Sequence, residues 1–104
     1  MTLMASNYNI IISRMAHMEL DEIREYITKK FDAPQAAIRQ TERILKAINA
    51  IAVFPKMYRV RRKSTGMRIC PVDNYLITYY VNDEKHIISI SRIIYSRRDI
   101  SSII

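Results

Sequence analysis

Two amphipathic helical segments, separated only by the stretch Asp32-Ala33-Pro34, constrain the fold of this chain more than any other feature. Over residues 13–31, apolar side chains recur at the three- and four-residue spacing of one helix face, namely Ala16, Leu20, Ile23 and Ile27. A second stripe, over residues 34–52, contains Ala37, Ile38, Thr41, Ile44, Leu45, Ile48 and Ile51. Helices joined this closely fold back as an antiparallel hairpin. Both stripes are then expected to face a common sheet.

Four short β-branched runs predict the strands of that sheet. One precedes the helices, at residues 8–13, and three follow them, at residues 68–72, 75–81 and 86–94. Pro71 lacks an N–H, so the strand that contains it is expected to be an edge or bulged strand. Strict alternation in the last strand would put Ile88, Ile90, Arg92 and Ile94 on one face, and Ser89, Ser91 and Ile93 on the other. The order β-α-α-β-β-β predicts an α+β fold, with a mainly antiparallel sheet, the helical hairpin on one face and the other face partly open.

The length of 104 residues accommodates one core, so we expect a single domain over residues 1–104. The first charged residue is Arg14, which argues against an export signal, and no apolar run approaches the ~20 residues of a membrane span. The single cysteine, Cys70, cannot form an internal disulfide. These features favour a cytoplasmic protein that does not enter a membrane, although they leave open whether Met1 or Met4 is the true start.

No metal or other cofactor is expected, because His17 and His86 have no ligand spacing to Cys70 or to each other. The acidic residues of the first helix are interpreted as a solvated face; they are Glu19, Asp21, Glu22 and Glu25.

The net charge of +7 is concentrated in the segment that joins the second helix to the sheet. Residues 55–68 contain no acid and six cations: Lys56, Arg59, Arg61, Arg62, Lys63 and Arg68. Such a basic segment attracts phosphate backbones or an acidic protein partner. An ordinary solvated loop is the alternative.

The chain resembles the RelE/ParE superfamily of toxins from bacterial type II toxin–antitoxin systems. The resemblance rests on "IIISRMAHMELDEIREYI", "AIRQTERILKAINAIAVFP" and "NYLITYYVNDEKHIISISRIIYSRRDI", in that order. The matching positions are Ala16, Leu20, Ile23, Phe54, Pro55, Tyr79, Val81, Arg92, Arg97, Arg98 and Asp99. No single piece is specific, and the ordered combination carries the match. It implies a small growth-arresting toxin that a cognate antitoxin neutralises, and operator DNA contacted only through that antitoxin.

The superfamily contains two activities, and the residues favour one of them. RelE-like members enter the ribosome and cut mRNA without a metal, whereas ParE-like members inhibit DNA gyrase. The RNA-cutting members carry an arginine where this chain has Leu76, and an aromatic residue near the position of Ser102. The ending "SRIIYSRRDISSII" resembles the ParE-like branch, with Tyr95 at the usual histidine. The resemblance therefore favours a non-enzymatic gyrase inhibitor, and a metal-independent mRNA interferase is the alternative.

The candidate site residues follow from these hypotheses. A ribonuclease would use Arg68, Arg92 and Tyr95, although Arg92 can equally form a salt bridge to a carboxylate such as Asp99, and Tyr95 can simply pack. Contacts to the target or to phosphate are expected from Lys56, Arg59, Arg61, Arg62, Lys63, Arg97 and Arg98. Antitoxin contacts are expected from the open sheet face and from Ile100, Ile103 and Ile104, since exposed isoleucines would otherwise be a liability. A third possibility is an inactive toxin retained only for its antitoxin or operator partner.

Overall fold

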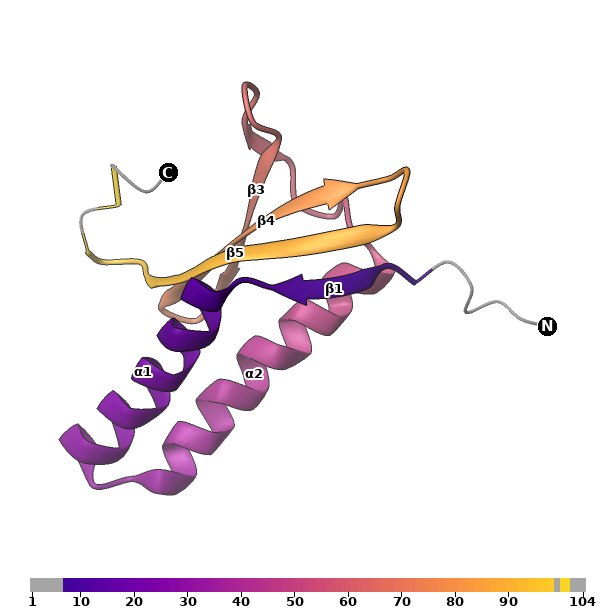
Figure 1. The fold of residues 1–104 in the computed structure, drawn as a ribbon. Helices are drawn as coiled ribbons and strands as arrows, with labels where there is room; N and C mark the ends of the chain where they lie inside the picture. Colours follow the sequence, from indigo (N-terminus) through magenta and orange to yellow (C-terminus); the bar gives the residue numbers. More distant parts are fainter. Residues whose placement is uncertain (1–6, 99, 102–104) are drawn as a thin grey trace.

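The computed structural model describes residues 7–98 and 100–101. Its elements are β1 (Asn9–Ile12), α1 (Arg14–Phe31), α2 (Pro34–Val53), β2 (Val60–Arg62), β3 (Met67–Val72), β4 (Tyr75–Asn82) and β5 (Ile87–Tyr95). One layer is a five-stranded sheet and the other is the hairpin of α1 and α2 (Figure 1). The predicted α+β fold is confirmed, with the addition of the three-residue strand β2, which the sequence analysis did not predict. In the described part of the chain, no helix is long and apolar enough to cross a membrane.

The helix boundaries follow from local chemistry. Ser13 caps α1, because its hydroxyl accepts a hydrogen bond from the backbone N–H of Ala16 at 3.0 Å. Asp32 ends that helix in the left-handed conformation with φ 47°, which Asp tolerates better than most residues. Pro34 then occupies the first turn of α2, where its missing N–H costs nothing.

The sheet has the strand order β1-β5-β4-β3-β2. Only β1 and β5 pair in parallel, and the whole helical hairpin forms the crossover between β1 and the rest of the sheet. The short strand β2 pairs with β3 only around Met67 and Arg68. Beyond that point β3 is effectively an edge, so Pro71 lies where no outer strand requires its N–H.

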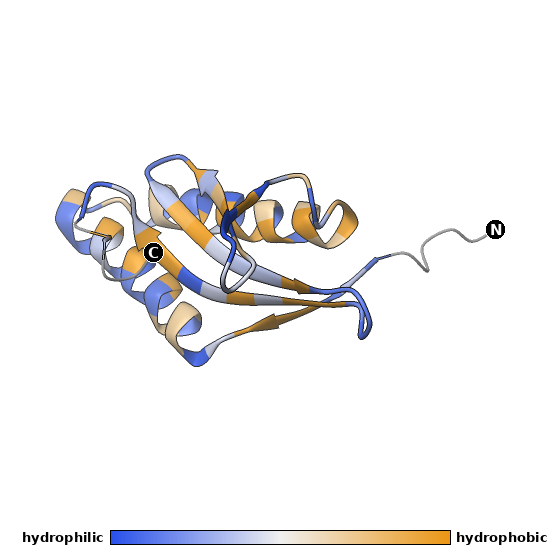
Figure 2. Cartoon of the chain, turned by 90° about the horizontal axis from the view of Figure 1, so that it is seen from above, coloured by the Kyte–Doolittle hydropathy of each residue, from blue (hydrophilic) through white to orange (hydrophobic). Residues whose placement is uncertain are grey.

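The core lies between the helices and the inner face of the sheet. Isoleucine dominates it, with Ile44, Ile48 and Ile51 of α2 packed against Ile77, Ile88 and Ile90 of the strands. Burying one such side chain stabilises the fold by about 1.5–3 kcal/mol. In Figure 2 the strands show orange, hydrophobic segments between paler ones, whereas the turn between β4 and β5 is blue and hydrophilic.

The helix stripes were predicted too wide. Ile38 and Leu45 are 45% and 38% exposed, whereas Ala37 and Ile44 are fully buried. Each exposed residue follows a buried one, and one residue corresponds to about 100° around the helix axis. The pair therefore lies on the flank of α2, beyond its contact with the sheet.

A bulge in β5 makes the predicted alternation wrong. Thr78 pairs with Arg92 and Tyr79 pairs with Ile90, which leaves Ser91 as an extra residue. A bulge of this kind shifts every later side chain to the other face. Ile93 consequently joins Ile88 and Ile90 in the core, and the side chain of Arg92 is placed on the opposite side.

The outer face of the sheet is more closed than expected. Ile69, Thr78 and Ile94 are 6%, 1% and 1% exposed, although they face away from the helical hairpin. The sheet twists strongly, so that β3 crosses β5 at a steep angle (Figure 1). This curvature lets side chains in the middle of the outer face shield one another.

Candidate functional site

The basic segment leads from the end of α2 into a β-hairpin, which consists of β2, a turn and β3. This hairpin rises away from the helical layer (Figure 1). Four of its cations are exposed and make no ion pair within residues 7–98 and 100–101: Arg59, Arg61, Arg62 and Lys63. Their charges are therefore free to meet a ligand.

The two cations at the ends of the segment have partners within the protein. The Lys56 ammonium lies 2.8 Å from an Asp83 carboxylate oxygen, and this contact lowers the pKa of Asp83. The Arg68 guanidinium donates a hydrogen bond to the Tyr58 carbonyl oxygen at 2.6 Å. Both side chains help hold the connection from α2 to the sheet. The four cations between them in sequence have no such partner among the described residues.

Arg92 is bound to Glu19 of α1. Its Nη2 and Nε atoms lie 2.7 and 3.0 Å from one Glu19 carboxylate oxygen, and the other oxygen accepts the backbone N–H of Ile93 at 2.8 Å. The pair is mostly buried, with side-chain exposures of 24% and 9%, and it raises the pKa of Arg92. The interpretation of Glu19 as part of a solvated face is therefore wrong.

Two roles were predicted for Arg92, a ribonuclease residue or a salt bridge to a carboxylate. The structure shows a salt bridge, and the carboxylate is that of Glu19. Asp99, the partner named from the sequence, lies outside the described residues. The charge of Arg92 is thus balanced within the fold.

The three candidate ribonuclease residues lie on different parts of the sheet. Arg68 is directly opposite Tyr79 on the helix-facing side of the sheet, and Arg92 is opposite Thr78 on the other side. Tyr95 lies at the end of β5, 43% exposed, with its ring 5.9 Å from that of Tyr75. These side chains do not converge on a common point.

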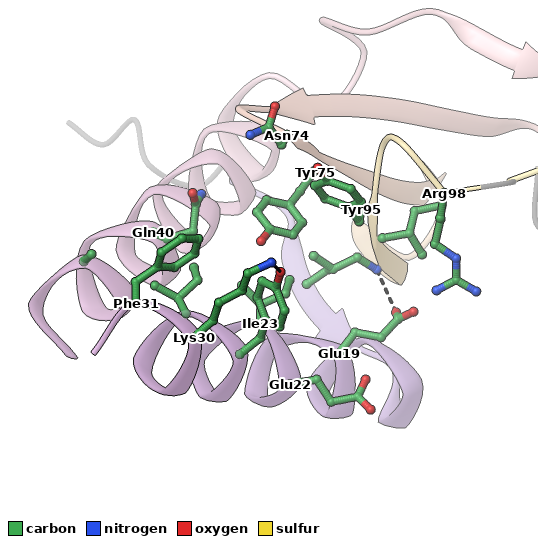
Figure 3. Close-up of a pocket in the computed structure, with 15 residues that line it drawn as sticks. Glu19, Glu22, Ile23, Lys30, Phe31, Gln40, Asn74, Tyr75, Tyr95 and Arg98 are labelled. Atoms are coloured by element: carbon green, nitrogen blue, oxygen red, sulfur yellow. Dashed lines mark hydrogen bonds between the residues drawn. The ribbon is translucent and has the colours of Figure 1, made fainter. Parts of the chain in front are cut away.

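An aromatic groove opens between the far half of the helical hairpin and the end of the sheet (Figure 3). It encloses about 810 Å³. Its aromatic walls come from Tyr26 and Phe31 of α1, Tyr75 of β4 and Tyr95 of β5. Tyr26 and Phe31 are 52% and 61% exposed, respectively. Large exposed rings gathered in one hollow are typical of a protein-binding surface.

Two cations and two acids line the groove, and one of the acids, Glu19, is already engaged with Arg92. The Lys30 ammonium lies 2.8 Å from the Tyr26 hydroxyl and 5.8 Å from the centre of the Phe31 ring, and the hydrogen bond raises the pKa of Lys30. Arg98 and Glu22 are exposed on the opposite border. The groove therefore combines an apolar floor with charged edges.

The residues predicted to contact an antitoxin are only partly described. Ile100 is half-buried and lies two residues after Arg98 of the groove, whereas Ile103 and Ile104 lie outside the described residues. Arg97 is exposed beside Arg98 in the turn that follows β5. The sequence analysis missed the groove itself. Tyr26 lies off the apolar stripe of α1, whereas Phe31 continues that stripe one turn beyond Ile27, and both large aromatic residues could have indicated the groove.

Among the described residues, no three His, Cys, Asp or Glu side chains are grouped so that they could hold a metal ion. Cys70 is 2% exposed, and burial raises the pKa of its thiol. A buried thiol of this kind is a poor nucleophile.

The fold is similar to those of several solved toxins. The chain has a TM-score of 0.70 and 18% identity to a chain of the chromosomal ParDE system of P. aeruginosa, covering 86% of this chain and 97% of that one. It has a TM-score of 0.64 and 15% identity to the isolated E. coli RelE toxin, covering 91% and 92%. For the RelBE2 toxin–antitoxin complex of Mycobacterium tuberculosis the values are 0.60 and 19%, with coverage of 86% and 98%.

These solved proteins share their small α+β fold with this chain. The model of the family described as "ParE toxin of type II toxin-antitoxin system, parDE" matches residues 10–100. The chain therefore belongs to this ParE toxin family, as its sequence predicted. No curated protein sequence is significantly similar to it.

Proposed function

We propose that this toxin arrests growth in the cytoplasm by binding DNA gyrase, without an enzymatic activity of its own. The observation that carries the proposal is the engagement of Arg92 with Glu19, at 2.7 Å in a mostly buried pair. A cation that stabilises a phosphorane must be free to face it. Arg92 is the cation of the last strand that an RNA-cutting site would use, and its charge is neutralised by Glu19.

The other ribonuclease candidates support the same proposal. Arg68 is anchored to the Tyr58 carbonyl, and its strand position puts it on the opposite face of the sheet from Arg92. Leu76, at the position where the RNA-cutting members carry an arginine, brings no charge. General acid–base chemistry requires its groups within hydrogen-bond reach of a common substrate, and this arrangement does not provide that.

The target is tested by pulse-labelling of DNA, RNA and protein synthesis in the minutes after the gene is induced alone. We expect DNA synthesis to stop first, and the purified protein to inhibit gyrase supercoiling in vitro. An early stop in protein synthesis, with supercoiling unaffected, would favour the ribosome-dependent mRNA endoribonuclease instead. Expression without any growth defect would identify an inactive toxin.

The antitoxin is proposed to occupy the aromatic groove. Tyr26, Phe31 and Tyr95 are all exposed there, and burying such rings against a partner is worth more than leaving them in water. Glu22, Lys30 and Arg98 at the borders suit a segment with an apolar face and charged flanks. Ile100, together with Ile103 and Ile104, would extend this contact beyond Arg98. The solved RelBE2 relative is itself a toxin–antitoxin complex.

A further inference from the structure

The free cations of the β2–β3 hairpin are concentrated on one protruding element. Arg59, Arg61, Arg62 and Lys63 occupy five consecutive positions that include only one other residue, Val60. All four side chains are exposed, whereas Val60 is half-buried. Arg59 directly precedes β2, Arg61 and Arg62 belong to it, and Lys63 begins the turn that follows. The four charges are therefore close together along the chain at the β2 side of the hairpin.

A bulge changes how these side chains are presented. Val60 pairs with Arg68 and Arg62 pairs with Met67, so that Arg61 is an extra residue in β2. Bulges re-aim side chains and break the alternation between the two faces. Consecutive arginines at a bulge are not divided between opposite faces as they would be in a regular strand.

Apart from Pro71, the other exposed residues of the hairpin are polar. Met67 is 3% exposed, and the turn between the strands offers Ser64 and Thr65. Protein-binding surfaces usually have an apolar or aromatic centre, which this hairpin lacks. Arginine, lysine, serine and threonine are the side chains that most often contact phosphate and sugar.

The shape and composition favour a duplex over a single strand. A two-stranded β-ribbon fits the major groove of B-form DNA, about 12 Å wide. The major groove of duplex RNA is too narrow for side chains to read. Single-stranded nucleic acids are held largely by stacking on aromatic rings, and residues 59–68 contain no aromatic residue.

We propose that the β2–β3 hairpin binds the phosphate backbone of duplex DNA, without sequence preference, through Arg59, Arg61, Arg62 and Lys63. This inference does not depend on which target the toxin inhibits. It concerns a direct contact with DNA of any sequence, whereas the resemblance implies only that operator DNA is contacted through an antitoxin. Lys56 and Arg68 are not part of the contact, because each has a partner within the protein.

The test is fluorescence anisotropy of the purified protein with a short labelled duplex of arbitrary sequence, measured over a range of salt concentrations. Each neutralised phosphate contributes about 0.9 to the slope of log K against log salt. Four cations predict a slope near −3.6, or about a hundredfold loss of affinity for a fourfold rise in salt. Replacing all four residues by glutamine should reduce the magnitude of the slope by about 3.6, to near zero.

A matched control separates a local contact from the net charge. Arg14, Arg39, Lys46 and Lys85 are exposed cations that make no ion pair among the described residues. Changing these four to glutamine lowers the net charge by the same amount and should leave the slope close to that of the wild type. Circular dichroism on both variants checks that the fold is retained. If the fourfold hairpin change disturbs the fold, the double variant Arg61→Gln/Arg62→Gln should reduce the slope by about two.

Three outcomes would overturn the proposal. Equal losses in the hairpin and control variants would assign the binding to net charge alone. Tighter binding to single-stranded RNA of the same length would exclude a duplex site. Absence of binding at low salt would mean that the exposed cations serve another class of partner, such as an acidic protein.

Discussion

Glu19 of α1 takes the place of a missing strand beside Ile93 of β5. The parallel pairing of β1 with β5 ends at Ile90. Three residues farther along β5, the backbone N–H of Ile93 donates a hydrogen bond to one carboxylate oxygen of Glu19 at 2.8 Å. The other oxygen holds the Arg92 guanidinium. A sheet edge with free N–H groups can pair with another chain, and this carboxylate closes the edge at that point.

Replacing Glu19 by alanine should lower the free energy of unfolding by about 2–4 kcal/mol, because a buried N–H and a guanidinium both lose their partner. Glu19→Gln keeps an acceptor for Ile93 and should cost less. Urea denaturation of the purified variants measures both changes. Glu22→Ala, an exposed position on the same helix, is the control and should change the stability by less than about 0.5 kcal/mol. Equal stabilities for Glu19→Ala and Glu22→Ala would show that the carboxylate does not stabilise the edge.

Phe31→Ser should weaken antitoxin binding at least tenfold, because an exposed aromatic ring at the centre of an interface often contributes more than 1.4 kcal/mol. The measurement is calorimetry with the purified cognate antitoxin. Phe54→Ser is a matched control, since Phe54 is 65% exposed and lies outside the groove. If only the Phe54 variant lost affinity, the antitoxin site would lie at the end of α2 instead.

Tyr79→Phe should destabilise the fold by about 1–2 kcal/mol, because it removes a hydroxyl that pairs with a part-buried backbone carbonyl. The Tyr79 ring is fully buried, and its hydroxyl donates to the Pro55 carbonyl at 2.9 Å. Burial raises the pKa of Tyr79 to about 12, so the hydroxyl stays protonated at physiological pH. Thermal unfolding compares this variant with Tyr80→Phe, whose half-buried side chain should tolerate the change. Similar melting temperatures for the two variants would contradict the prediction.

Acid should destabilise the protein partly through Asp73 and Asp83. The Arg43 guanidinium at 2.8 Å lowers the pKa of Asp73, and Lys56 lowers that of Asp83. A carboxyl whose folded pKa lies below its unfolded value stabilises the fold above the unfolded pKa, and this contribution disappears as the pH falls through the folded pKa. The melting temperature of Asp73→Asn/Asp83→Asn should therefore fall less than that of the wild type between about pH 5 and pH 2. Asparagine also tolerates the positive φ of 55° at Asp73.

Glu84→Gln is the control for this experiment, because Glu84 is exposed and makes no ion pair among the described residues. Its acid response should match that of the wild type. A double variant that lost stability as steeply as the wild type would show that these two carboxyls do not contribute.

The sequence by itself determined the two helices, four of the strands and the family. Each depends on a local or periodic signal: the stripes at Ala16 and Ile44, the cap at Ser13, the break at Pro34, and short β-branched runs. The basic segment was also visible, although not as a hairpin, because six cations without an acid need no tertiary information to be recognised. The exception was β2, whose three residues are too few to show a period.

Only the tertiary structure decided which of the charged and aromatic residues are free. The bulge at Ser91 depends on how β4 pairs with β5, and no pattern within β5 indicates it. The contact of Glu19 with Arg92 joins residues 73 positions apart, and the groove at Tyr26 and Phe31 needs α1 placed against the end of the sheet. Residue types and spacing determine local conformation, whereas partners distant in sequence are set by the packing of whole elements against one another. For that reason the sequence identified the arginines, and the fold determined that Arg92 is engaged while Arg61 and Arg62 are free.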